Sequence, residues 1–470
     1  MFEISDIFIE EKSVLKEGKE LLITDIDKPV ISFQLQSDRR ETSLRSACIR
    51  VNNWIAEVKE QIGIKYEGEP LKPFTRYDVE IEAVDDRGNN STKCAEFMTG
   101  RKRLPWSGKW ITDEMHVTEK PNSPRPLYFR RKIHLEKAVE ESWIVVTAIG
   151  IFDVLLDGRR ISEDYFSPGF TDYEHNLQYC CYRMGELQEG DHELFVTVAA
   201  GWAVGRTTNI SNTNQSVSLL TADRQALLAE WYIVYKDGSR EVVSTDGAYE
   251  VTADGPYQYA DFYDGEIYDA RFKETDWKWR KADVVTPDIH PMIEARYGEP
   301  VTGHEIFAPI SCKEVYSGEK GETEIIYDFG QNLSGVVEFE ADGETGQIIR
   351  ICHAEALEHG KLYRTNLRSA KQEICYYCMD GKQTYAPRFT YMGFRYISVS
   401  GIEKEKIKVQ ARAIYSDLTV TGDFSCSDER LNQLQKNLVW SGKDNFVDIP
   451  TDCPQRDERQ GWTGDIALFA

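Results

Sequence analysis

Short runs of alternating apolar and polar residues recur along the chain as far as about residue 410. Residues 77–84 form one such run, before the turn residues Asp86, Arg87 and Gly88, and residues 230–235 form another. Alternation with a period of two is the pattern of a strand that buries one face. Many short strands separated by turn residues are typical of β-sandwiches. The pattern therefore predicts a series of β-sandwich domains.

The period changes near residue 425. Apolar residues then recur at the three- and four-residue spacing of an amphipathic helix, at Leu431, Leu434, Leu438 and Val439. Ser425, with Asp428 three residues later, predicts the N-terminus of this helix, and Gly442 is expected to end it. Asp465 is a candidate N-cap for a further helix. The sequence thus predicts a mostly β chain that becomes helical in its last part.

Linker-like segments divide the β region. The basic, proline-containing stretch 99–105 predicts a boundary near residue 103, and the polar stretch 282–287 predicts another near residue 292. The resulting units are residues 1–103, 104–292, 293–415 and 416–470. The first has the size of one fibronectin type III-like sandwich.

Composition narrows the choice of partners. Lysine and arginine number 56 against 79 aspartates and glutamates, so the formal net charge is −23 and the pI is near 4.9. Nucleic acid and membrane surfaces are not expected as partners, because both call for a basic face. A neutral ligand such as a sugar fits an acidic protein. The aromatic share of 11% suits sugar stacking and sandwich cores alike.

The sequence predicts a cytoplasmic protein. The first residues lack a long apolar segment, and no apolar run approaches the roughly 18–20 residues of a membrane span. Ten cysteines are scattered without a repeated spacing, and we interpret them as free thiols in a reducing compartment.

Charged residues crowd one segment near the end of the sequence. Four carboxylates, two arginines and a tryptophan occupy the fourteen positions Asp452-Cys-Pro-Gln-Arg-Asp-Glu-Arg-Gln-Gly-Trp-Thr-Gly-Asp465, called the terminal motif below. Such a segment predicts the edge of a polar pocket. A general acid there must keep its proton near neutral pH, which neighbouring carboxylates favour and the two arginines oppose. From the residues alone, plainer roles stay open: a helix cap for Asp465, an exposed ion pair for Asp457 and Arg459, and a core position for Trp462.

The terminal motif resembles the signature of the α-L-rhamnosidases of glycoside hydrolase family 78. Other segments are similar to the β region of that family: Ser167-Pro-Gly-Phe-Thr-Asp-Tyr173, Tyr263-Asp-Gly-Glu-Ile-Tyr-Asp-Ala-Arg271, Asp328-Phe-Gly-Gln-Asn-Leu-Ser-Gly335, His353-Ala-Glu355 and Pro387-Arg-Phe-Thr-Tyr-Met-Gly-Phe-Arg-Tyr396. The resemblance covers roughly residues 105–470, and the residues before it match only as a generic sandwich.

The resemblance implies a fold and an activity. Residues 104–292 would form a β-sandwich or jelly-roll domain of the rhamnosidase N-terminal type, and residues 293–415 a concanavalin-like β-sandwich. Residues 416–470 would form the truncated start of an (α/α)6 catalytic barrel. The family hydrolyses terminal α-L-rhamnosides with inversion, using a carboxylic acid and an opposed carboxylate base.

The resemblance also implies roles for residues of the terminal motif. Glu458 takes the place of the general acid. Asp452 and Asp465 take the places of acids that hold the rhamnose hydroxyls, Trp462 lines the sugar pocket, and Arg456 belongs to the substrate-binding set. No cofactor and no metal are expected, and the expected partners are rhamnose-containing glycosides, with a homo-oligomer left open. Calcium ligands in the second unit are candidates by residue type only: Asp153, Asp157, Asp172 and Asp261.

Two other functions stay open. The family's catalytic base lies far downstream in the barrel, so residues 1–470 are expected to be inactive by themselves. The first alternative is therefore a non-catalytic carbohydrate-binding β-sandwich fragment. The other alternative is an inverting (α/α)6 glycosidase that acts on a different sugar, against which the intact terminal motif argues.

Overall fold

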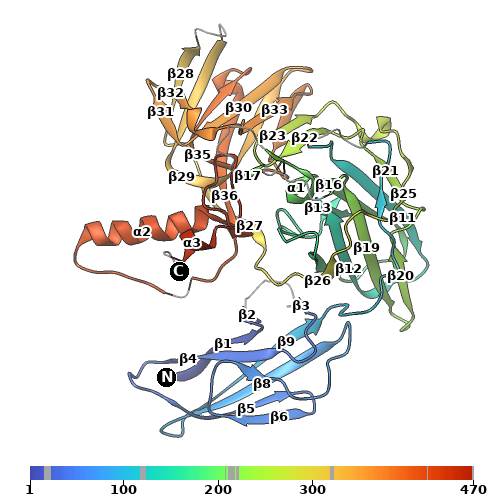
Figure 1. The fold of residues 1–470 in the computed structure, drawn as a ribbon, viewed down its shortest axis with the longest axis vertical. Coiled ribbons are helices and arrows are strands. Elements are labelled where there is room, and N and C mark those ends of the chain that lie inside the picture. The colour runs from blue at the N-terminus through green and yellow to red at the C-terminus, as the bar shows by residue number, and fades with distance from the viewer. Residues whose placement is uncertain are drawn as a thin grey trace.

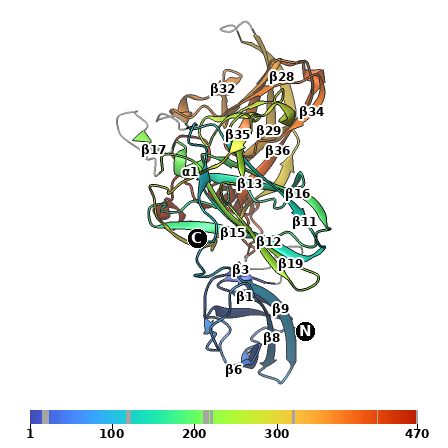
Figure 2. The same cartoon turned by 90° about the vertical axis from the view of Figure 1, so that its right-hand side faces the viewer.

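The computed structural model describes residues 1–14, 23–116, 123–206, 208–209, 217–218, 222–317, 322–420 and 422–467. β-Sandwiches follow one another along the long axis of the molecule, and a long helix projects to one side (Figures 1 and 2). The prediction of a mostly β chain that becomes helical near its end is confirmed.

The N-terminal sandwich has two sheets whose described strands lie within residues 2–99. One sheet contains, in spatial order, β2 (Lys12–Ser13), β1 (Phe2–Ile9), β4 (Val30–Ser37) and β7 (Ile64–Lys65). The other contains β3 (Ile23–Thr24), β9 (Asn90–Thr99), β8 (Arg76–Asp85), β5 (Leu44–Val51) and β6 (Trp54–Val58). In β8, Tyr77, Val79, Ile81 and Ala83 are buried between more exposed neighbours, as the alternation predicts.

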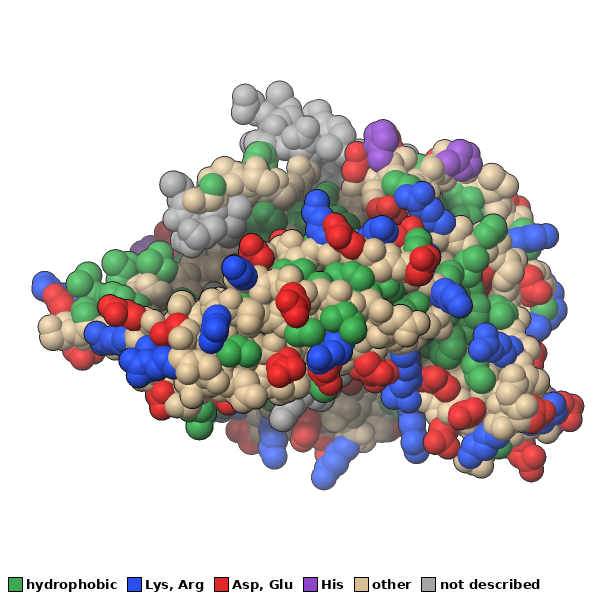
Figure 3. Space-filling view, turned by 90° about the horizontal axis from the view of Figure 1, so that it is seen from below, with side chains coloured by type: hydrophobic (Ala, Val, Ile, Leu, Met, Phe, Trp, Pro, Cys, Tyr) green, Lys and Arg blue, Asp and Glu red, His purple; other side chains and the backbone are tan. Residues whose placement is uncertain are grey.

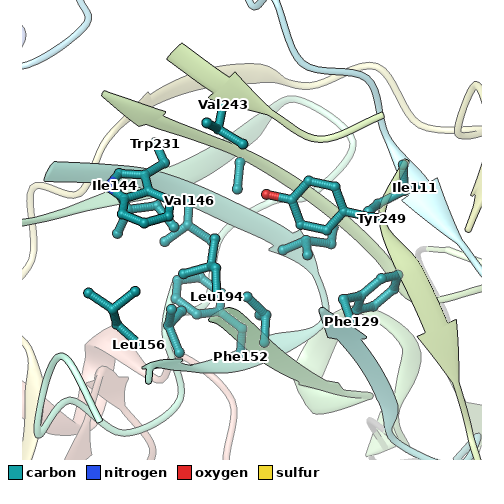
Figure 4. Packing of buried hydrophobic residues seen from close by; sticks show 14 of the residues in the cluster. Ile111, Phe129, Ile144, Val146, Phe152, Leu156, Leu194, Trp231, Val243 and Tyr249 are labelled. Atoms are coloured by element: carbon teal, nitrogen blue, oxygen red, sulfur yellow. The ribbon is translucent and has the colours of Figure 1, made fainter. Parts of the chain in front are cut away.

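The second sandwich also has two sheets. One contains β25 (Asp283–Val284), β10 (Ile111–Thr112), β19 (Ala226–Tyr235), β12 (Val139–Ile149), β15 (Asn176–Arg183) and β26 (Met292–Ala295), with β20 (Arg240–Ser244) paired to β19. The other contains β14 (Arg159–Arg160), β13 (Ile151–Leu156), β16 (Gly190–Ala199), β11 (Leu127–Leu135), β21 (Glu250–Thr252) and β24 (Arg280–Lys281). Ile144 and Trp231 of the first sheet pack against Phe152 and Leu194 of the second (Figure 4).

The third sandwich is built around a long sheet. Its strands are β22 (Tyr257–Asp261), β23 (Gly265–Asp269), β33 (Glu373–Tyr377), β30 (Ile348–Ala354), β35 (Met392–Ser400), β29 (Glu322–Gly343), β36 (Ile407–Ser416) and β27 (Val301–Phe307), with β28 (Ser311–Ser317) and β34 (Gly381–Tyr385) paired to β29. The sheet thus draws strands from both sides of residue 292. Between Asp328 and Leu333, the register of β29 against β35 shifts.

Short elements complete the fold. The small hairpins are β17 (Thr208–Asn209) with β18 (Val217–Ser218), β31 (Ala356–Glu358) with β32 (Lys361–Tyr363), and β37 (Phe446–Val447) with β38 (Ile449–Pro450). The helices are α1 (Gly201–Val204), α2 (Glu429–Asp444) and α3 (Thr463–Ile466), and the 3-10 turns are η1 (Glu274–Asp276), η2 (Thr365–Leu367) and η3 (Lys404–Lys406). Over the described residues, none of the helices has the length and apolar character that crossing a membrane requires.

The helix α2 differs from the prediction at both ends. It begins at Glu429 because Asp428, not Ser425, is its N-cap, and the Asp428 side chain accepts the Arg430 N–H at 3.0 Å. It continues past Gly442 to Asp444. The expected role of Asp465 as a cap is also wrong, because α3 begins two residues before it.

One side of α2 is packed and the other is open. Trp440 donates its indole N–H to the Asn332 carbonyl at 2.7 Å, and Lys443 pairs with Glu305 at 2.7 Å, so this side lies on the third sandwich. The four apolar residues that predict the helix are all exposed, Leu434 by 51%. Hydrophobic side chains accordingly gather on the projecting end of the molecule (Figure 3).

An aromatic cluster joins the second and third sandwiches. Phe166 and Trp202 from the second sandwich pack with Phe262 and Tyr391 from the third, and the ring centroids of Phe166 and Phe262 lie 5.1 Å apart. Val447 of β37 is fully buried in the same cluster. The chain just before the terminal motif is therefore fixed to the junction between the two sandwiches.

Candidate active site

The terminal motif is an irregular loop across this junction. It follows the β37–β38 hairpin and leads into α3. Asp452 and Arg459 have positive φ angles of 65° and 52°, so the backbone turns at both residues. The Trp462 N–H donates to the Pro450 carbonyl at 3.0 Å and closes the loop. Asp452 lies on a loop, as the proline two residues after it predicts.

One face of the terminal motif is buried against the sandwiches. The Arg459 side chain is 2% exposed and donates from Nη1 to the carbonyls of Phe262 at 2.7 Å and Tyr391 at 2.9 Å. The Asp457 carboxylate accepts the backbone N–H of Ser369 at 3.1 Å and is also bonded by the Ser369 hydroxyl. These two side chains hold the loop to the third sandwich.

The other face brings three predicted site residues together. Arg456 donates from Nε to Oε2 of Glu458 at 2.6 Å, and its Nη2 lies 3.4 Å from the Asp452 carboxylate. Arg368, from the third sandwich, places Nη1 3.1 Å from the same Glu458 oxygen. Glu458 is 5% exposed. Among the described residues, no polar side chain binds its other oxygen, Oε1.

Segments from earlier in the sequence pack against the terminal motif and the β37–β38 hairpin. Tyr263 donates its hydroxyl to the Glu458 carbonyl at 2.6 Å. The Asp448 carboxylate accepts the backbone N–H of Phe170. Gly393 lies so close that a Cβ there would stand 2.7 Å from Pro454. Three of the segments that carry the resemblance thus meet at the terminal motif and its hairpin.

A cleft of about 670 Å³ opens beside the terminal motif. Its walls come from the irregular part of β29, from the residue after β30, from α2 and the residue after it, and from the terminal motif: Gln331, Asn332, Glu355, Gln433, Lys436, Asn437, Trp440, Ser441, Asp444, Asn445, Asp452, Cys453, Pro454, Gln455 and Arg456. Strand irregularities of this kind redirect side chains next to binding sites. The abundance of amide side chains suits a ligand rich in hydroxyl groups.

Two carboxyls in the cleft have altered acidity. Burial raises the pKa of Asp444 to about 8, and the nearby carboxylates of Glu355 and Glu305 add to this effect. Burial also raises the pKa of Glu355, which accepts an amide hydrogen bond from Asn332 at 2.8 Å. Asp444 is therefore mostly uncharged at neutral pH.

The remaining predicted residues are placed less completely. Trp462 is partly exposed and is not among the residues that line the cleft. The backbone of Asp465 lies in α3, and its side chain is outside the described part of the structure. Their sugar-binding roles stay predictions.

Sequence reasoning missed three residues at the site. Glu355 stands in a segment that carries the resemblance, but the pattern gave it no role. Asp444 looks like an ordinary polar position in an amphipathic helix. Arg368 lies in the loop after η2, where no sequence signal links it to a position ninety residues later.

Potential metal-ligating atoms gather at one place in the described residues, where Asp452, Cys453 and Glu458 have such atoms within 4.8 Å of one another. Arg456 contacts both carboxylates and supplies the positive charge that a cation would bring. We assign no metal to this cluster. The four aspartates considered for calcium have other partners, such as Arg160 for Asp153.

Families of known domains match the chain in succession. They are described as Rha78A-like, N-terminal immunoglobulin domain at residues 15–102, alpha-L-rhamnosidase N-terminal domain at 137–302, bacterial alpha-L-rhamnosidase concanavalin-like domain at 318–415, and bacterial alpha-L-rhamnosidase 6 hairpin glycosidase domain at 419–470.

Individual proteins agree with these matches. An alpha-L-rhamnosidase of Formosa agariphila is 32% identical over 98% of this chain and 54% of its own length. The crystal structure of the alpha-L-rhamnosidase from Aspergillus terreus superimposes with a TM-score of 0.88 at 26% identity, over 99% of this chain and 55% of that one. A Streptomyces avermitilis alpha-L-rhamnosidase complexed with L-rhamnose shares the fold, with a TM-score of 0.85 at 22% identity over 100% of this chain and 63% of that one. The chain spans about half the length of the curated relatives that it matches.

Proposed function

We propose, from the premise that this chain belongs to the α-L-rhamnosidases of glycoside hydrolase family 78 as an N-terminal portion, that the intact protein releases terminal α-L-rhamnose from rhamnosides with inversion. The observation that carries the proposal is the position of Glu458. It is a nearly buried carboxyl on the open face of the family's signature loop, beside a polar cleft.

Glu458 is the proposed general acid. Arg456 and Arg368 both bind Oε2, so Oε1 is the oxygen that can carry the proton toward a glycosidic oxygen. The support from Tyr263 at the Glu458 carbonyl fixes the backbone beneath the carboxyl. Because the carboxyl is already oriented, the reaction does not have to supply the entropic cost of orienting it.

The general base is proposed to lie outside residues 1–470. Inversion requires a second carboxylate roughly 6.5–9.5 Å from the acid, on the opposite face of the sugar. One carboxyl of the cleft, Asp444, does not suit this role, because burial raises its pKa to about 8 and it therefore holds its proton at neutral pH. A base must instead be charged when it activates water.

Rhamnose is proposed to bind beside Asp452. This carboxylate lines the cleft and lies next to Arg456, so it can accept hydrogen bonds from sugar hydroxyls at the site of reaction. Trp462 and Asp465 complete the proposed sugar site. A cytoplasmic location fits the ten cysteines, all of which are free thiols.

The direct test is hydrolysis by the intact protein. We expect turnover of p-nitrophenyl α-L-rhamnoside but not of the matching α-L-fucoside or β-D-glucoside. Proton NMR of the first product should show β-L-rhamnose before mutarotation. Release of α-L-rhamnose first would contradict inversion. Turnover of the fucoside or the glucoside in place of the rhamnoside would support the alternative of a glycosidase for another sugar.

A second candidate applies to residues 1–470 alone, which we propose bind rhamnosides without hydrolysing them. Asp452, Arg456 and the cleft all lie within these residues, while the proposed base does not. Isothermal calorimetry should detect rhamnose binding, and the p-nitrophenyl assay should show no turnover. Turnover that is abolished by Glu458→Gln would mean that residues 1–470 supply the second carboxylate themselves.

A further inference from the structure

Arg368 occupies a backbone position that favours glycine. Its φ and ψ angles are 59° and −114°, and the Ala370 N–H donates to the Leu367 carbonyl at 3.1 Å. These angles and this hydrogen bond define a type II′ turn with Arg368 at its first central position. Glycine is the usual residue there, because a side chain at positive φ crowds the backbone. Strained residues of this kind concentrate at functional sites.

The side chain of Arg368 reaches the proposed general acid. Its Nη1 lies 3.1 Å from Oε2 of Glu458 and 3.9 Å from Oδ1 of Asp457, and the side chain is 43% exposed. Arg368 thus occupies a backbone position that suits glycine, and its guanidinium contacts a nearly buried carboxyl. We interpret the turn as one that places this guanidinium beside Glu458.

The turn itself is firmly anchored. Ser369 donates its backbone N–H to Asp457 at 3.1 Å, and its hydroxyl accepts a hydrogen bond from Arg206 at 2.9 Å. On the other side of the turn, Lys371 and Gln372 donate their N–H groups to the Tyr263 carbonyl at 3.1 and 2.9 Å. The same Tyr263 donates its hydroxyl to the Glu458 carbonyl. Tyr263 therefore binds both the backbone of the turn and the backbone of the general acid.

We propose that Arg368 is a positioning residue for the general acid, supplied to the catalytic loop by the third sandwich. This inference rests on the proposed function. Arg368 and Arg456 hold Oε2 from two sides, which fixes the rotation of the carboxyl and leaves Oε1 to donate the proton. Once the proton has left, the two guanidinium groups stabilise the resulting carboxylate. The third sandwich thereby helps to position the group that donates the proton.

The charges around Glu458 set the expected pH dependence. The groups that face it are Arg368 from the turn, Arg456 and Asp452 from the open face of the terminal motif, and the adjoining Cys453 and Asp457. Removing the Arg368 charge takes away a cation that favours the charged carboxylate. The alkaline limb of the pH profile, where the acid loses its proton, should then move to higher pH.

The test uses Arg368→Gly in the intact enzyme. We expect kcat on rhamnosides with poor leaving groups to fall about 10- to 100-fold, and the alkaline limb of kcat/KM to rise by about one pH unit. Glycine relieves the turn, so the Tm should equal or exceed that of the wild type. Arg368→Lys should retain the wild-type alkaline limb and recover part of kcat.

His359→Gly is the matched control. His359 has a φ of 51° in the exposed turn between β31 and β32, outside the site. It should gain stability in the same way, with kinetics unchanged. Arg368→Gly with an unmoved alkaline limb, or with a Tm well below that of the wild type, would overturn the inference and leave a structural arginine. A wild type without rhamnosidase activity would instead overturn the proposed function, and this inference with it.

Discussion

Asp457 and Glu458 are neighbours in sequence, yet their carboxylates meet different parts of the molecule. Asp457 lies on the buried face of the terminal motif and is bonded by Ser369, whereas Glu458 lies on the open face with Arg456. The arginines divide in the same way. Arg459 donates to the carbonyls of the sandwiches, and Arg456 joins the two carboxylates beside the cleft.

The comparison of the two faces shows that the type of a residue does not by itself determine its role in the terminal motif. On the buried face, charged groups satisfy backbone atoms of other domains, so their removal should cost stability. On the open face, charged groups contact one another beside the cleft, so their removal should cost chemistry or binding. The following variants test this division, from the largest expected effect to the smallest.

Glu458→Gln should have the largest effect. Without a proton to donate, kcat on alkyl rhamnosides should fall by about 10²- to 10⁴-fold, while activated aryl rhamnosides, which need little protonation, should lose much less. Steady-state kinetics on both substrates measures the difference. Asp457→Asn is the control from the buried face, and its losses should not depend on the leaving group. Equal losses of kcat on both substrates with Glu458→Gln would show that Glu458 is not the general acid.

Arg459→Met should lower stability instead. The change leaves the carbonyls of Phe262 and Tyr391 buried without their donor, at about 1–3 kcal/mol for each. We therefore expect a loss of about 2–6 kcal/mol for the two carbonyls together, measured by urea denaturation. Arg456→Met on the open face is the matched control and should unfold at nearly the wild-type urea concentration. A larger loss of stability for Arg456→Met than for Arg459→Met would contradict the division into a buried and an open face.

The overall fold could be predicted because its signals are local. Alternation in segments such as β8 and the change of period before α2 are read directly from neighbouring residues. Helix ends were harder, since Ser425 and Asp428 are both good caps and only the three-dimensional path of the chain selects Asp428. The grouping of Asp452, Arg456 and Glu458 followed from their closeness in sequence and from the resemblance.

The division into two faces could not be predicted. Whether Arg459 or Arg456 turns inward depends on carbonyls contributed by Phe262 and Tyr391, far away in sequence. The same limit hid Arg368 and Glu355, which reach the site only because the third sandwich packs against the terminal motif. Long-range contacts of this kind leave no periodic signal in one sequence.

The hairpin before the terminal motif should respond to pH through Asp448, which lies between β37 and β38. Burial raises the pKa of this carboxyl from 3.8 to about 6, so the folded state binds more protons than the unfolded state between about pH 4 and 6. Its contribution is therefore fully present below about pH 4 and is lost as the pH rises through 6, by an amount on the order of 3 kcal/mol.

Asp448→Asn removes this titration, while its amide oxygen can still accept the Phe170 N–H. Relative to the wild type, the variant should gain stability between pH 4.5 and 7, as measured by urea midpoints at both values. A difference between variant and wild type that stays constant with pH would show that Asp448 does not titrate in this range.

Asp452→Asn should have the smallest effect, and on binding alone. Asparagine keeps a hydrogen-bond acceptor but loses the charge, so we expect about 1.5 kcal/mol, or roughly a tenfold rise in the Kd for rhamnose. Isothermal calorimetry on the intact protein measures this, with Asp423→Asn on the exposed surface as the control. Because Asp452 lies on the open face, urea denaturation should not change. Lower stability with unchanged rhamnose affinity would show that Asp452 has a structural role. Arg456 and Glu458 would then be the residues of the open face that act in binding or chemistry.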